Sequence, residues 1–183
     1  DLKIELLSLN NVEQMRAIKK GELDITFTRH NLHSDEIESK FVLREPLIFL
    51  LPKDHPLAKY ERIPVTALNG IDFIIPAKEQ SNTLHDVILD FAKTNHIEFN
   101  IVQRADNILF NINSIGMGLG CTILPGYIAP LTMNNTVIRS LDVELPYLDL
   151  YASYRKDRNS VAVDKFIELL TRVFYLDINR VEI

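Results

Sequence analysis

Apolar residues along this chain switch repeatedly between strand-type and helix-type spacing, and this alternation limits the folds open to it. Residues 3–9 alternate apolar and polar positions as a strand does, and Val12, Met15 and Ile18 then recur at helical spacing. Residues 23–28 have the pattern of a second strand. This order predicts a β-α-β unit, which makes parallel strands. The alternation continues to the C-terminus, so the sequence predicts an α/β fold.

Short polar residues and glycine mark the ends of the predicted helices. We expect Asn11 to cap the first helix, with Gln14 three residues later completing a capping box. Gly21 stands where that helix should end, because glycine readily takes the left-handed conformation of a helix terminus. Asp106 is expected to cap a helix over residues 107–115.

Strands are expected wherever short apolar runs lie between turn residues. Residues 29–40 are polar and are expected to form a loop, and Glu45-Pro46 is expected to interrupt the strand that follows. The remaining expected elements are helices over residues 83–95 and 161–175, the latter capped by Ser160, and strands over residues 41–43, 47–51, 71–75, 97–104, 121–125, 137–141 and 148–154.

Composition excludes several classes of protein. With 183 residues, 46% of them hydrophobic and 25% charged, the chain can form one large domain or two small ones. Its net charge of −5 argues against a free-standing nucleic-acid-binding domain, which is usually basic. No apolar run reaches the roughly 18–20 residues of a membrane helix. No signal peptide opens the chain, whose first residues have the pattern of a domain interior.

No catalytic, cofactor or metal motif emerges, so we expect no catalytic residues, no cofactor and no metal. Residues 116–120 are glycine-rich but follow a helix, whereas a dinucleotide fingerprint follows a strand. A metal site at His30 and His33, which have acidic residues nearby, stays an open alternative, although their spacing matches no recognised pattern of metal ligands. Cys121 is the lone cysteine and lies beside an apolar strand, so we expect a buried small hydrophobic residue there.

Three segments resemble the effector-binding domain of LysR-type transcription regulators. Residues 17–25 (AIKKGELDI) come first, and residues 43–47 (LREPL) run into residues 51–58 (LPKDHPLA). Residues 116–125 (GMGLGCTILP) come last, and the order and spacing fit across nearly the whole chain. Met117 departs from the family, which usually has a small residue before the second glycine of this motif.

The resemblance implies a type 2 periplasmic-binding-protein-like fold, in which two Rossmann-like subdomains enclose a ligand cleft. It assigns residues 1–44 and 146–183 to subdomain I and residues 45–145 to subdomain II. The family's first strand and helix would precede Asp1, so we expect the chain to be trimmed at its N-terminus.

Open parallel sheets bind ligands at the carboxyl ends of their strands, where helix N-termini offer N–H groups and a positive dipole end. Two helix starts qualify, and Arg29 ends a strand and can hold a carboxylate with two hydrogen bonds. In relatives that respond to aromatic-pathway acids, matching positions line the effector pocket. The expected effector-binding residues are Asn10, Asn11, Arg29, Ser81, Asn82 and Thr83. An open alternative is that the residues at the helix starts are helix caps and nothing more, and that Arg29 is a surface residue.

The resulting interpretation is a cytoplasmic bacterial sensor for a small carboxylate, aromatic or dicarboxylic, which is not an enzyme. It implies a homodimer or homotetramer, with DNA bound only through a helix-turn-helix domain absent from this chain and with no membrane contact. Two alternatives stay open. A periplasmic solute-binding protein for a small anionic metabolite would share the fold, and a small α/β enzyme such as a dehydratase would show turnover of a bound acid.

Overall fold

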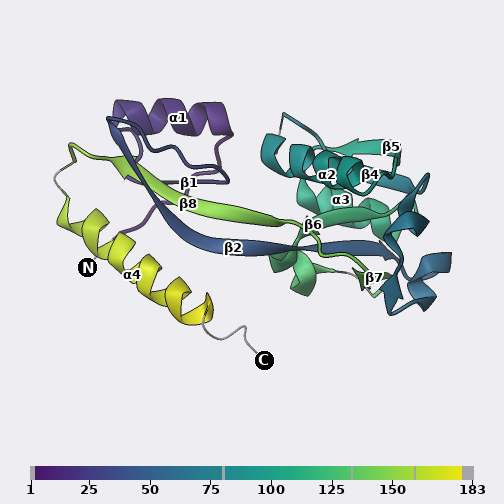
Figure 1. Ribbon diagram of the computed structural model, residues 1–183. Helices are drawn as coiled ribbons and strands as arrows, with labels where there is room; N and C mark the ends of the chain where they lie inside the picture. Colours follow the sequence, from purple (N-terminus) through teal and green to yellow (C-terminus); the bar gives the residue numbers. More distant parts are fainter. Residues whose placement is uncertain (1–2, 80, 133, 159, 179–183) are drawn as a thin grey trace. The chain divides into compact units, whose positions relative to one another are not determined.

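The structure is a computed structural model that describes residues 3–79, 81–132, 134–158 and 160–178, with side chains described up to residue 173 (Figure 1). Among these residues the helices are α1 Asn11–Lys20, α2 Asn82–Thr94, α3 Ile108–Gly116 and α4 Val161–Ile178. The strands are β1 Thr26–Thr28, β2 Ile37–Pro52, β3 Arg62–Ile63, β4 Asp72–Pro76, β5 Asn100–Ala105, β6 Thr122–Pro125, β7 Thr136–Leu141 and β8 Tyr147–Arg155. Short 3-10 turns occupy Pro56–Lys59, Val65–Leu68 and Gly126–Leu131.

The chain divides into two compact units. Residues 1–44 and 149–183 form unit 1, and residues 45–148 form unit 2. Strands β2 and β8 contribute residues to both. Hydrogen bonding orders one set of strands as β1-β8-β2-β7-β3, with β6 also paired to β2, while β4 and β5 form a separate pair.

Unit 1 has a helix on each side of its strands, and each helix buries its own apolar cluster. Figure 1 shows α1 on one side of β1 and β8, with α4 on the other. On the α1 side, Ile18 packs with Leu32 and Ile37. On the α4 side the buried residues are Val42, Ala152, Tyr154, Val163 and Ile167.

Unit 2 holds the larger core, built around β4. Strands β4 and β5 run parallel, from Asp72 opposite Asn100 to Pro76 opposite Ala105. A parallel bridge between Phe73 and Cys121 brings the residue before β6 against β4. Figure 1 shows α2 and α3 beside this strand pair. Because both parallel strands end at the same edge, the helix that follows each of them starts there.

The strand expected over residues 3–9 is wrong, and so is the parallel β-α-β unit built on it. No described residue forms a strand ladder with this segment, and Leu6 is 88% exposed. Alternating apolar residues suit a strand, but a strand exists only where a neighbour supplies hydrogen bonds. The following strand, β1, pairs antiparallel with β8.

Glu45-Pro46 does not break the strand. β2 runs without interruption from Ile37 to Pro52, and it includes the end of the expected loop over residues 29–40. Pro46 is exposed, and the ladder with β6 begins one residue later at Leu47. The N–H group that proline lacks is therefore not needed for this ladder.

Two expected helix caps are displaced by one residue. Asn10, not Asn11, caps α1, and its partner in the capping box is Glu13 in place of Gln14. Asn107, not Asp106, caps α3, where its side chain accepts the N–H of Phe110 at 2.8 Å. Adjacent residues of similar capping strength explain both errors.

Candidate functional site

In unit 1 the start of α1 and the end of β1 lie at the same end of the strand. The chain reverses at Gly21, whose φ of 72° is left-handed as predicted, so α1 and β1 run in opposite directions. The hydroxyl of Thr26 donates to Oε1 of Gln14, one turn into the helix. Because the two elements run in opposite directions, Asn10, which precedes this contact in the chain, and Arg29, which follows it, lie toward the same end of unit 1.

The start of α1 is capped by its own side chains. Oδ1 of Asn10 accepts the N–H of Glu13 at 2.9 Å, and the carboxylate of Glu13 accepts the N–H of Asn10 at 3.0 Å. Asn10 thus caps the helix through its side-chain oxygen and its backbone N–H group, and its side-chain amide nitrogen takes no part in the capping box. Glu13, which sequence reasoning missed, also places a negative charge at the positive end of the helix. Asn11 is the exposed first residue of the helix.

Arg29 directly follows β1 and is partly buried. Its Nη1 atom is shielded from solvent and has no hydrogen-bond partner in the part of the chain that the structure describes. A buried charged donor without a partner is costly, because it has left water and gained nothing in exchange. The neighbouring Thr28 is satisfied, since its hydroxyl donates to the carbonyl of His30 at 2.8 Å. The end of β1 therefore carries a buried guanidinium donor for which the described residues supply no acceptor.

In unit 2 the start of α2 follows the shared carboxyl end of β4 and β5. Nδ1 of the buried His85 donates to the carbonyl of Pro76 at 2.8 Å, which fixes the first turn of α2 to the end of β4. Ser81 is the N-cap, but its side chain makes no capping hydrogen bond. Oδ1 of Asn82 accepts the N–H of Thr83 at 2.9 Å.

The two helix starts therefore differ in electrostatics. The first turn of α2 contains no acidic residue, whereas that of α1 contains Glu13. An anion near α2 meets the helix dipole without a competing carboxylate in that turn. The next acid, Asp86, is paired with Lys78 at 3.1 Å. Of the predicted residues, the structure brings Asn10, Asn11 and Arg29 to one end of unit 1 and Ser81, Asn82 and Thr83 to one helix start of unit 2.

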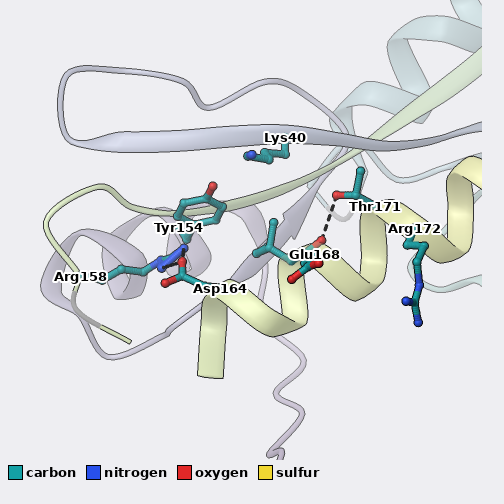
Figure 2. A pocket seen from close by; sticks show the side chains of 8 residues that line it. Lys40, Tyr154, Arg158, Asp164, Glu168, Thr171 and Arg172 are labelled. Atoms are coloured by element: carbon teal, nitrogen blue, oxygen red, sulfur yellow. Dashed lines mark hydrogen bonds and ion pairs between the residues drawn. The ribbon is translucent and has the colours of Figure 1, made fainter. Parts of the chain in front are cut away.

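Sequence reasoning missed a hollow of about 540 Å³ in unit 1 (Figure 2). Its lining residues come from β2, β8, α4 and the loop between β8 and α4, and are Lys40, Tyr154, Arg158, Asp164, Ile167, Glu168, Thr171 and Arg172. Arg158 stacks on the Tyr154 ring at 3.9 Å and donates twice to Oδ1 of Asp164, at 2.8 and 3.1 Å. These contacts tie the loop before α4 to the first turn of that helix. None of the predicted site residues lines this hollow.

The remaining candidates have structural surroundings. Cys121 is fully buried, as expected, and burial raises the pKa of its thiol to about 12. His30 is exposed, and Nδ1 of His33 lies 3.7 Å from Glu38. Within the described residues no three His, Cys, Asp or Glu side chains gather as metal ligands would. The same residues include no helix with the length and apolar character to span a membrane.

Related proteins are regulators of transcription. The chain is 35% identical over 170 residues to the Hca operon transcriptional activator HcaR of Escherichia coli, across 93% of this chain and 57% of that protein. It is 27% identical over 168 residues to the HTH-type transcriptional regulator AlsR of Bacillus subtilis, across 92% of this chain and 56% of that protein. The chain thus spans little more than half the length of these relatives. These relatives do not favour the alternative that the chain is a periplasmic solute-binding protein.

Solved structures share the fold. The effector binding domain of BenM with its effector benzoate superposes with a TM-score of 0.80 at 16% identity, covering 96% of this chain and 80% of that one. The effector binding domain of QuiR in complex with shikimate gives 0.76 at 17% identity, covering 91% and 78%. The predicted α/β class and type 2 periplasmic-binding-protein-like fold are confirmed.

A family match completes the assignment. Residues 1–174 match the family described as the LysR substrate binding domain, which is nearly the whole chain. The chain therefore belongs to the LysR substrate-binding domain family.

Proposed function

We propose that this chain is the effector-sensing part of a LysR-type transcription regulator and that it binds a small carboxylate. Its relatives are transcriptional regulators, and two solved effector-binding domains of the same fold are complexes with benzoate and with shikimate. Both of those ligands are ring-bearing carboxylic acids. The effector shifts the population toward the arrangement of the two units that it contacts best.

The proposed site draws on residues from both predicted subdomains, residues 1–44 with 146–183 and residues 45–145; the two units of the structure differ from these only in placing residues 146–148 in unit 2. Arg29 and the amides of Asn10 and Asn11 come from one subdomain. Ser81, Asn82 and Thr83, at the start of α2, come from the other. In this arrangement the carboxylate meets a guanidinium group and a helix N-terminus, and apolar contacts supply the remaining affinity.

The observation that carries this proposal is the buried, unpartnered Nη1 of Arg29. A carboxylate is the natural partner for it, since the pair forms a charge-assisted hydrogen bond in a partly dry environment. A surface arginine would have water at this atom. Ligand binding thus satisfies a donor that the described residues leave unsatisfied.

Calorimetric titration tests the proposal directly. Benzoate, shikimate and succinate are titrated against this chain and against a longer protein that also carries the proposed helix-turn-helix domain. Benzamide serves as the uncharged match for benzoate. We expect at least one acid to bind, benzamide to bind far more weakly, and Arg29→Gln to lower the affinity about tenfold or more. Arg16→Gln, a matched change on the exposed face of α1, should leave the affinity unchanged. Binding by no acid, or equal binding by Arg29→Gln, contradicts the proposal.

The proposal extends to the whole protein. In this proposal the whole protein acts in the cytoplasm as a homodimer or homotetramer, binds DNA through a helix-turn-helix domain outside this chain, and does not turn over its effector. Light scattering of the longer protein measures its oligomeric state. Proton NMR of a bound acid over several hours tests for turnover, and conversion of the acid would favour the enzyme alternative.

A further inference from the structure

An ion pair stands at the boundary where both connecting strands leave unit 1. Unit 1 ends at Arg44 in β2 and resumes at Asp149 in β8. Nε of Arg44 donates to Oδ1 of Asp149 at 2.8 Å, and Nη2 donates to Oδ2 at 3.2 Å. Two parallel hydrogen bonds fix the orientation of both side chains, which a single contact would not do.

On the unit 1 side of this pair, β2 and β8 are held together by successive side-chain contacts. The rings of Phe41 and Tyr151 meet edge to face, with centroids 5.9 Å apart and planes at 77°. Further from the boundary, the hydroxyls of Ser39 and Ser153 are 2.8 Å apart. Cross-strand pairs of this kind stabilise the pairing of β2 with β8.

On the unit 2 side, the next residues are held by unit 2. Oε1 of Glu45 accepts the N–H of Tyr127 at 2.9 Å, and Leu47 lies opposite Pro125 in the ladder with β6. Leu148 is buried in the core of unit 2. The change from one unit to the other therefore falls within one peptide link of each strand, between residues 44 and 45 and between residues 148 and 149.

We propose that Arg44 and Asp149 form a clasp that couples the two connecting strands and stabilises one arrangement of the two units. Any rotation of one unit against the other must change backbone angles in both strands near these two links. With the clasp closed, the strands are tied side by side and must bend together. With the clasp open, the strands keep the hydrogen bonding that makes them neighbours in the sheet but lose this side-chain tie at the boundary, so they are coupled less tightly and more arrangements become accessible. This inference needs only the division into two units and holds whether or not a carboxylate is the effector.

The test is a distance measurement between the two units of the ligand-free chain. Nitroxide labels on Lys93→Cys in α2 and Lys165→Cys in α4, both exposed positions, report the distance by electron-electron double resonance. The native Cys121 is buried and stays unlabelled. Arg44→Gln and Asp149→Asn should each broaden the distance distribution and raise its minor population about two- to fivefold, the effect of a partly exposed ion pair on a two-state equilibrium.

Two further variants make the result decisive. The exchange Arg44→Asp with Asp149→Arg restores a pair of opposite charges and should narrow the distribution again. Asp164→Asn removes the ion pair of Arg158 in the same unit, away from the boundary, and should leave the distribution unchanged. An unchanged distribution in Arg44→Gln and Asp149→Asn, or equal broadening in Asp164→Asn, overturns the clasp. Because no ligand is present, such a failure says nothing about the proposed effector.

Discussion

The carbonyl of Asp72 accepts the N–H of Cys121 at 2.8 Å, so the chain passes against β4 with no room for a side chain at residue 120. A Cβ atom on Gly120 would lie 2.7 Å from that carbonyl oxygen. We expect Gly120→Ala to lower the free energy of unfolding by about 3 kcal/mol, because backbone must move in a packed core. Urea unfolding followed by circular dichroism measures the loss.

Gly118 provides the matched control two residues earlier. Its φ is +81°, and nothing lies within 4 Å of a Cβ added there. Gly118→Ala should therefore lose only the backbone strain of a left-handed residue, about 1–2 kcal/mol. A loss for Gly120→Ala no larger than that for Gly118→Ala would show that the contact with Asp72 relaxes freely.

The capping box of α1 predicts a second stability effect. Asn10→Ala should lower the free energy of unfolding by about 1 kcal/mol, since the N–H of Glu13 loses its acceptor. Asn10→Asp keeps an acceptor and should be nearly neutral. Asn113→Ala, an exposed change within α3, should be neutral or slightly stabilising because alanine favours helix interiors. Equal losses for Asn10→Ala and Asn10→Asp would contradict the capping role.

Local chemistry made the helices predictable, while pairing between distant residues decided the strands. The helical spacing of apolar residues and the glycine at the helix end predicted α1, and Gly21 took the expected left-handed conformation. The sequence could not decide between Asn10 with Glu13 and Asn11 with Gln14, because both pairs suit a capping box. It could not show that residues 3–9 lack a partner strand, because pairing is not a local property.

The candidate site follows the same division. Helix starts at strand ends can be read from sequence, and so can the presence of Arg29. The unpartnered Nη1 of Arg29 and the missing capping bond of Ser81 depend on how neighbours pack. Arg44 and Asp149 are 105 residues apart in the chain, so their contact is visible only after folding.

His55 predicts a pH dependence of stability. Burial lowers its pKa below the ordinary 6.5, and the charge of Asp72 offsets part of this shift. Its Nδ1 also accepts the N–H of Leu57 at 3.2 Å, which requires the neutral ring. The folded chain thus binds a proton here less readily than the unfolded chain. This contribution to stability is complete above pH 6.5 and is lost as the pH falls from 6.5 through the lowered pKa.

The measurement compares urea unfolding at pH 7.5 and pH 5.5. His55→Asn keeps a capping acceptor but does not titrate, so it should lose less stability between the two pH values than the parent chain. His30→Asn, an exposed change, should behave as the parent does. The same pH slope in His55→Asn and the parent would exclude this residue as the source.

The charge of Glu13 bears on the proposed carboxylate site. Its carboxylate lies at the start of α1, at the end of unit 1 that also holds Arg29, and should repel an anionic effector. Glu13→Gln removes this charge but keeps the capping box, because glutamine also accepts the N–H of Asn10. We expect the affinity for benzoate or another bound acid to rise about two- to fivefold at low salt and less at high salt. Glu22→Gln, after the other end of α1, should change nothing. An unchanged affinity in Glu13→Gln would move the carboxylate away from α1, toward the start of α2.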